Sequence, residues 1–176
     1  MGTAVRLRSR GTRVLGAAMV GTAVLGLGSA LLGGADDLLR FGAPVALFGV
    51  LGWAAFWEPY VEVSDGGITV ANTLRTVHVP WPAVRSVNGR YGLRLSTAYG
   101  PVTAWAASAP AGRERAGSKE SHTSAVVSAK LEELRDAGHL DNPRLEAEAL
   151  ATRWHRHLVA TILVLLAGTV LLPLVV

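Results

Sequence analysis

Three long apolar stretches without a charged residue dominate the hydropathy pattern of the chain. They cover residues 14–35, 41–57 and 158–176, and are 22, 17 and 19 residues long. A helix of the first length would rise about 33 Å, close to the thickness of a bilayer's hydrocarbon core. We therefore expect three transmembrane helices, of which the first two form a hairpin over residues 14–57.

The start of the chain also fits a cleaved signal peptide, which is the competing interpretation. An arginine-rich beginning precedes the first apolar stretch, and the small residues Gly33, Gly34 and Ala35 end it. However, this stretch is long for the core of a signal peptide, and a second one follows after five residues. These two features favour the helical hairpin.

Between residues 60 and 106 the pattern changes to an alternation of apolar and polar residues, which is typical of strands with one buried face. Glycine-containing turns at 65–67 and 98–101 interrupt the alternation. We expect about six short antiparallel strands in a small meander or partly closed barrel. The alternating runs are residues 60–64, 68–72, 76–79, 85–88, 93–95 and 102–106.

The rest of the polar region predicts a loop followed by helices. Residues 107–121 are rich in Ala, Ser, Gly and Pro, as a loop would be. Residues 125–137 place Val127, Leu131 and Leu134 on one helical face, and Gly138 is a stop signal. Asn142 and Pro143 are typical of a helix start, so we expect a juxtamembrane helix within residues 139–157 that leads into the third span.

Charge placement predicts the orientation in the membrane. The tail of residues 1–13 contains four arginines, whereas Asp36 and Asp37 lie in the short connection 36–40 between the first two spans. By the positive-inside rule the tail is cytoplasmic, the connection is outside, and residues 58–157 are cytoplasmic. Basic and aromatic residues just before the third span would anchor it at the interface, namely Arg153, Trp154 and Arg156.

Composition excludes several classes of function. Residues 58–157 contain twelve basic and eleven acidic residues, and this near neutrality argues against nucleic-acid binding. The chain has no cysteine, so thiolate nucleophiles, thiolate metal sites and disulfides are excluded. The abundance of Ala, Gly, Val, Leu and Arg suggests a GC-rich bacterial genome.

No residue pattern predicts an enzyme, a cofactor or a metal site. His155 and His157 are two residues apart, so on a helix they cannot share an ion, and His78 is expected on an exposed strand face. A nucleophile elbow is missing, and the Gly-Leu-Gly at residues 26–28 lies within a span rather than at a phosphate loop. Asp36 and Asp37 fit a solvated turn better than a cation site.

The first span places Ala18, Thr22, Gly26 and Ala30 at intervals of four residues. Small residues at this spacing let helix backbones approach closely. Two interpretations follow: the stripe forms a dimer face, or it packs the two hairpin helices against each other. We favour the second.

Residues 61–70, 72–84 and 103–106 together resemble a known family. The runs Val-Glu-Val-Ser-Asp-Gly-Gly-Ile-Thr-Val, Asn-Thr-Leu-Arg-Thr-Val-His-Val-Pro-Trp-Pro-Ala-Val and Thr-Ala-Trp-Ala are similar to the bacterial PH-like domain of the actinobacterial low-molecular-weight protein antigen 6 type. The resemblance covers residues 57–107, and the preceding hairpin matches the usual architecture of the family. Its most specific parts are residues 75–84 and Trp105.

The resemblance implies a roll of two packed antiparallel sheets capped by a helix, for which residues 125–137 are the candidate. Six predicted strands, where a full PH roll has seven, and a third span after the cap are departures from the family. The expected fold is an α+β membrane protein with three transmembrane helices and a small PH-like β-roll over residues 58–138. The family has no common ligand, so the resemblance implies little chemistry.

The leading hypothesis for function is a non-enzymatic, multi-pass protein of the bacterial cell membrane. It would present the PH-like domain to an unidentified protein partner in the cytoplasm, as an interaction or assembly module. Alternatives are an anionic-lipid sensor and a small accessory subunit of a membrane complex. The sensor would use four arginines in or beside strands, namely Arg75, Arg85, Arg90 and Arg94.

Overall fold

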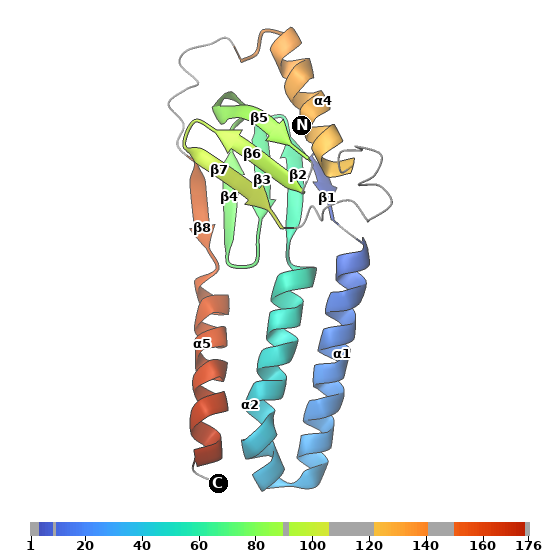
Figure 1. Cartoon of the computed structure of the whole chain (residues 1–176), viewed down its shortest axis with the longest axis vertical. Helices are drawn as coiled ribbons and strands as arrows, with labels where there is room; N and C mark the ends of the chain where they lie inside the picture. Colours follow the sequence, from blue (N-terminus) through green and yellow to red (C-terminus); the bar gives the residue numbers. More distant parts are fainter. Residues whose placement is uncertain (1–3, 9, 90–91, 106–121, 141–149, 175–176) are drawn as a thin grey trace. The chain divides into compact units, whose positions relative to one another are not determined.

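The chain folds as two compact units, shown in the computed structural model of Figure 1. The structure describes residues 4–8, 10–89, 92–105, 122–140 and 150–174. One unit is helical and comprises Arg10–Glu58 with His155–Val176. The other comprises Met1–Ser9 with Pro59–Trp154 and contains the strands.

The helical unit confirms that three helices are long and apolar enough to cross a membrane. They are Gly11–Gly33, Ala35–Trp57 and Arg156–Leu174. The first lies in α1 (Arg10–Gly33), and the second joins α2 (Ala35–Gly52) to a π-helical turn, η1 (Trp53–Trp57). The third joins α5 (Arg156–Leu171) to a 3₁₀ turn, η4 (Leu172–Leu174).

The connection between α1 and α2 is shorter than expected. Residues 36–40, predicted as a turn, lie inside α2, so the second helix begins at Ala35 rather than at residue 41. Gly34 alone reverses the chain, because its φ of 103° lies in a region that side-chain-bearing residues rarely adopt. Asp36 and Asp37 occupy the first turn of α2, where their charges are favourable to the helix dipole.

Close packing joins α1 to α2. A Cβ atom on Gly49 would lie 2.6 Å from the Ala23 Cβ, and one on Gly52 would lie 2.6 Å from the Met19 Cβ. Both distances are shorter than real Cβ contacts, so these positions require glycine. The predicted stripe was only partly right: Ala30 is buried, whereas Ala18 and Thr22 are exposed. Hairpin packing is therefore the observed role of small residues here.

The other unit contains a five-stranded antiparallel sheet in the order β1-β2-β3-β4-β8. Its strands are β1 (Val5–Leu7), β2 (Tyr60–Ser64), β3 (Gly67–Ala71), β4 (Arg75–Val79) and β8 (Ala151–Trp154). A second antiparallel sheet has the order β5-β6-β7 and consists of β5 (Val84–Asn88), β6 (Leu93–Thr97) and β7 (Gly100–Ala104). A 3₁₀ turn, η2 (Trp81–Ala83), connects the two sheets.

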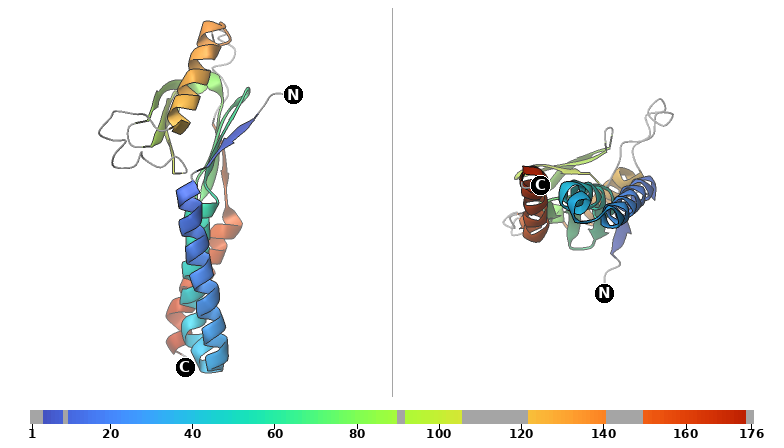
Figure 2. Two further views of the ribbon diagram at one scale, coloured as in Figure 1. Left: turned by 90° about the vertical axis from the view of Figure 1, so that its right-hand side faces the viewer. Right: turned by 90° about the horizontal axis from the view of Figure 1, so that it is seen from below.

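Alternating apolar residues of both sheets form one core. Its fully buried side chains include Val61, Ile68, Val70, Leu93 and Leu95. The helix α4 (His122–Asp136) adds Val127 and Leu131 to this core, and so closes one end of the roll (Figure 2). Gly138, with a φ of 68°, follows α4 as the sequence predicts. The six predicted strands are confirmed as β2 to β7, and the capping helix is confirmed as α4.

Two edge strands were missed. Residues 151–154, predicted as part of the helix 139–157, form β8 instead, and residues 141–149 lie outside the described residues. Residues 5–7, predicted as part of a basic tail, form β1. Both strands pair with a sheet edge that would otherwise leave backbone groups unpaired, and this tertiary pairing outweighs local helix signals.

Candidate interaction surfaces

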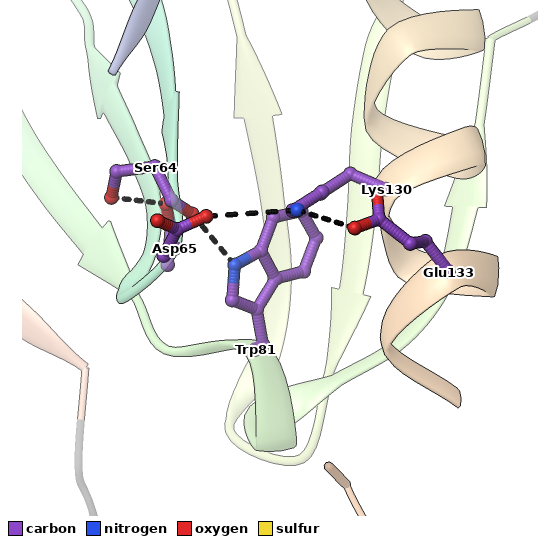
Figure 3. A network of polar contacts seen from close by, with 6 residues as sticks. Ser64, Asp65, Trp81, Lys130 and Glu133 are labelled. Carbon is purple, nitrogen blue, oxygen red and sulfur yellow. Dashed lines mark hydrogen bonds and ion pairs between the residues drawn. The ribbon is translucent and has the colours of Figure 1, made fainter. Parts of the chain in front are cut away.

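A polar network fastens α4 to the end of the roll that bears the β2–β3 turn (Figure 3). The buried Trp81 indole donates from Nε1 to the Ser64 carbonyl over 2.8 Å. Next to it, Lys130 Nζ lies 3.6 Å from Asp65 Oδ1 and 2.9 Å from Glu133 Oε1. The hydrogen bond with Glu133, with a smaller contribution from Asp65, raises the pKa of Lys130 above its usual value. Lys130 therefore stays cationic between two carboxylates.

Two cavities flank this network. One, of about 350 Å³, lies between α4 and the β1–β2 side, where Val5, Val63 and Val126 supply apolar walls and Glu133 a carboxylate. The other, of about 230 Å³, is lined by Trp81, Pro82, Leu134 and Leu140 with Asp65 at its rim. Asp65 and Glu133 have side chains that are 62% and 65% exposed. This end therefore offers apolar depressions bordered by accessible carboxylates.

The opposite end of the roll is held together by Asn72, which follows β3. Its Nδ2 donates to the Thr103 carbonyl and its Oδ1 accepts from the Trp105 amide, both over 2.8 Å. One side chain therefore fastens the five-stranded sheet to the end of β7. The exposed side chains of Leu74 and Trp105 belong to this corner.

Cations and aromatic rings also gather at this end of the five-stranded sheet. The guanidinium groups of Arg6 and Arg8 lie 4.1 and 5.0 Å from the centre of the Tyr60 ring. Arg6 also pairs with Glu62, with Nη2 2.9 Å from Oε2. At the other edge of the sheet, Arg75 lies 5.8 Å from the Trp154 ring, and the two residues are register partners.

Comparison with known families agrees with this architecture. A family model described as "Bacterial PH domain" matches residues 58–137. These residues form a bacterial PH-like domain. Neither the curated proteins nor the solved structures include a match to the chain. Assignment of the PH-like domain to the antigen 6 type stays a prediction.

The predicted lipid-contact arginines do not share one face of the PH-like domain. Arg75 belongs to β4 in the five-stranded sheet, whereas Arg85 and Arg94 lie on β5 and β6 of the other sheet, both exposed. Arg90 lies outside the described residues. The Arg85 carbonyl accepts a 2.9 Å hydrogen bond from Arg135, so the backbone there is engaged by α4. Arg75 is thus separated by sheet from Arg85 and Arg94.

The predicted interface anchors fall in both units. Arg153 and Trp154 end β8, where Trp154 is 57% exposed, and Arg156 is the first residue of α5. Sequence reasoning missed Arg6, Arg8 and Tyr60, because the apolar–polar alternation of β1 covers only three residues, which is too short to predict its pairing with β2. The arginine-rich start was visible, but it pointed only to topology.

His78 fits a structural role. Its Nδ1 lies 3.0 Å from the Thr69 hydroxyl of the neighbouring strand, and the residue is half-buried on the strand face that was predicted to be exposed. Among the described residues, no group of three or more His, Asp or Glu side chains is arranged to hold a metal ion.

Proposed function

We propose that the protein is a non-enzymatic, multi-pass protein of the bacterial cell membrane whose PH-like domain is a protein-interaction or assembly module on the cytoplasmic face. The spans would fix its position, and the α4 end of the domain would take the partner. The family match and the three apolar helices support this proposal at the level of architecture.

The observation that carries the proposal is how the chain enters and leaves the five-stranded sheet. Residues 8–9 connect β1 to α1, residues 58–59 connect η1 to β2, and residue 155 connects β8 to α5. Because neighbouring strands are antiparallel, β1 ends, β2 begins and β8 ends at the same end of the sheet. All three connections to apolar helices therefore leave from one end, and α4 lies at the other (Figure 1).

The cytoplasmic orientation rests on charge. Arg6 and Arg8 precede α1, Arg10 and Arg13 lie in its first turn, and Arg153 precedes the third apolar helix. At the other end of the hairpin are Asp36 and Asp37. The positive-inside rule places the arginines, and with them the PH-like domain, in the cytoplasm.

The cavities beside Lys130 suit a segment of a partner protein that carries apolar side chains and a basic residue. Valine side chains would accept the apolar groups, and the exposed carboxylates of Asp65 and Glu133 would attract the cation. Recognition of this kind needs a concave apolar surface with a few polar groups at its border.

Because the chain has no cysteine, site-specific cross-linking tests this proposal cleanly. Ala129→Cys places a thiol at an exposed position beside the larger cavity, and Ser96→Cys places a control thiol at an exposed position of β6. After attachment of a photoreactive benzophenone in native membranes, we expect one protein adduct at position 129 and none at 96. Combining Ala129→Cys with Glu133→Gln should weaken the adduct, because the carboxylate that attracts the partner's cation is lost. Equal adducts at both positions, or none, would overturn the proposal.

A further inference from the structure

The end of the PH-like domain opposite α4 gathers residue types that favour a membrane surface. Here the last residue of β8 faces the first of β4, as Trp154↔Arg75, and Arg153 faces Thr76. At the opposite edge of the same sheet, the guanidinium groups of Arg6 and Arg8 lie close to the ring of Tyr60, the first residue of β2. The cationic groups therefore lie at both edges of one sheet end.

Exposed apolar side chains lie at the same end. Trp154 is 57% exposed, Trp105 69% and Leu74 42%. Asn72 places the last two together, because it precedes Leu74 by two residues and binds the Trp105 amide. Tryptophan and tyrosine favour the boundary between headgroups and hydrocarbon, where one part of the ring is apolar and another is wet.

Among the residues that the structure describes, charge at this end is predominantly positive. Arg6 is paired with Glu62, and Glu58 lies in the connection to β2. Against these two carboxylates stand the four arginines Arg6, Arg8, Arg75 and Arg153. Each cation close to an anionic leaflet is attracted to it, and the attraction falls off within a Debye length.

Chain length makes this the end that can reach lipid. The three connections to the apolar helices contain two, two and one residues. An extended residue spans about 3.5 Å, so each connection reaches on the order of 10 Å. If the helices span the bilayer, the headgroup region is within reach of this end of the sheet.

We propose that Arg6, Arg8, Arg75 and Arg153, with Trp154, Trp105 and Leu74, form a membrane-contact rim that binds anionic lipid headgroups of the cytoplasmic leaflet. The arginines contact lipid phosphates, and the exposed apolar side chains enter the headgroup layer. Four of these seven residues, Arg6, Arg8, Arg153 and Trp154, lie outside the stretch 58–137 that matches the bacterial PH domain. Strands β1 and β8, with the residue after β1, therefore supply three of the four rim arginines and Trp154, and the matched stretch supplies the other three residues.

The rim goes beyond the proposed function and depends only on its membrane placement, not on a partner at α4. Full-length protein carrying Leu74→Cys, labelled with an environment-sensitive fluorophore, tests it in vesicles that contain about one-third phosphatidylglycerol. Ala98→Cys, at the exposed turn between β6 and β7, is the control at the other end. We expect acrylamide to quench the label at 74 about threefold less than the label at 98, with a blue-shifted emission at 74.

Charge variants then identify what holds the rim. Arg75→Glu with Arg153→Glu should raise quenching at 74 to the level at 98, whereas Arg94→Glu, at an exposed position of β6, should not change it. The pair Arg75→Lys and Arg153→Lys should retain protection, since it preserves charge. Unchanged thermal unfolding of each variant shows that loss of protection is not loss of fold.

The lipid and salt dependence completes the test. Protection should fall in vesicles of phosphatidylcholine alone, and also in about 0.5 M salt, where the screening length is about 4 Å. Free inorganic phosphate at matched ionic strength should have no further effect. Protection that ignores both lipid charge and the arginine variants would overturn the proposal. If the label at 74 is not protected but the adduct at position 129 forms, the membrane-contact rim is refuted and the proposed interaction function is not.

Discussion

Asn72 joins two segments next to the rim through three hydrogen bonds. Its two side-chain hydrogen bonds, each 2.8 Å, reach the carbonyl and the amide of residues 103 and 105. Its own amide donates to the Arg75 carbonyl over 2.9 Å, which shapes the turn between β3 and β4. The hydrogen bonds of Asn72 therefore hold the turn that carries Leu74 and also the backbone of Trp105.

Replacing Asn72 should weaken the roll measurably. In Asn72→Ala both side-chain bonds are lost and the backbone groups of β7 lose their partners, so we expect the free energy of unfolding to fall by about 1–3 kcal/mol. Urea unfolding of the full-length protein in detergent, followed by tryptophan fluorescence, measures this loss. Ser96→Ala, at an exposed position of β6, is the control and should change little. A loss no larger than the control's would mean that the corner does not depend on Asn72.

Among the elements, α1 and α2 depend most on glycine. Gly49 faces Ala23 so closely that even a methyl group has no room, whereas Gly21 on α1 has no atom within 4 Å of its Cβ position. In Gly49→Val the helices must separate or shift, and we expect a destabilisation of about 1–3 kcal/mol. Thermal unfolding in detergent should show it, while Gly21→Val should unfold near the wild-type temperature. Equal shifts for both variants would contradict close packing at Gly49.

The strand β8 makes a separate prediction. Since β8 pairs with residues 75–78 of β4, those amides of this stretch that point toward β8 should exchange slowly with deuterium. Thr152→Gly removes a β-branched residue from β8, which should cost about 1 kcal/mol and speed exchange in β4 by about fivefold. Hydrogen exchange read by mass spectrometry tests this, with Ala98→Gly as control. If residues 150–154 were helical, as the sequence pattern suggests, Thr152→Gly would leave β4 unchanged.

The elements show which features a sequence pattern can predict. Strands β2 to β7 were predictable because one face of each is buried, which forces apolar residues to alternate. The helix α4 was predictable from its buried stripe and from Gly138. By contrast, all four residues of β8 are exposed, so no alternation marks it. Its pairing with β4 joins residues far apart in the chain, which local patterns do not record.

The candidate surfaces were less predictable than the fold. Arg75, Arg153 and Trp154 were chosen from the sequence for two separate reasons, lipid contact and interface anchoring. The register Arg75↔Trp154 places residues chosen for both reasons side by side at one end of the sheet. Arg85 and Arg94 are separated from them because the turn η2 moves the chain to the second sheet. The strands that carry Arg75, Arg85 and Arg94 could be predicted, but neither the strand that carries Arg153 and Trp154 nor which strands share an end.

At the scale of the whole molecule, the strand directions put the two proposed surfaces at opposite ends of the PH-like domain. Three connections to apolar helices leave from one end of a sheet, where arginines and tryptophans gather. The other end carries α4, the cavities and the exposed carboxylates Asp65 and Glu133. A positive end suits an anionic leaflet, and a negative, concave end suits a protein segment with a basic residue. The two proposals therefore use different surfaces and can be tested separately.

Both proposals depend on which side of the membrane the domain occupies, and single cysteines in this cysteine-free chain can determine it. Ala35→Cys begins α2 at the hairpin turn, and Ala98→Cys lies in the PH-like domain; both positions are exposed. With a membrane-impermeant maleimide on intact cells, we expect labelling at 35 and none at 98, because the arginines favour the cytoplasm. Permeabilised cells should label at both positions, which controls for reactivity. The reverse pattern would put the domain outside the cell and refute a cytoplasmic partner and an inner-leaflet rim together, since both need the same side.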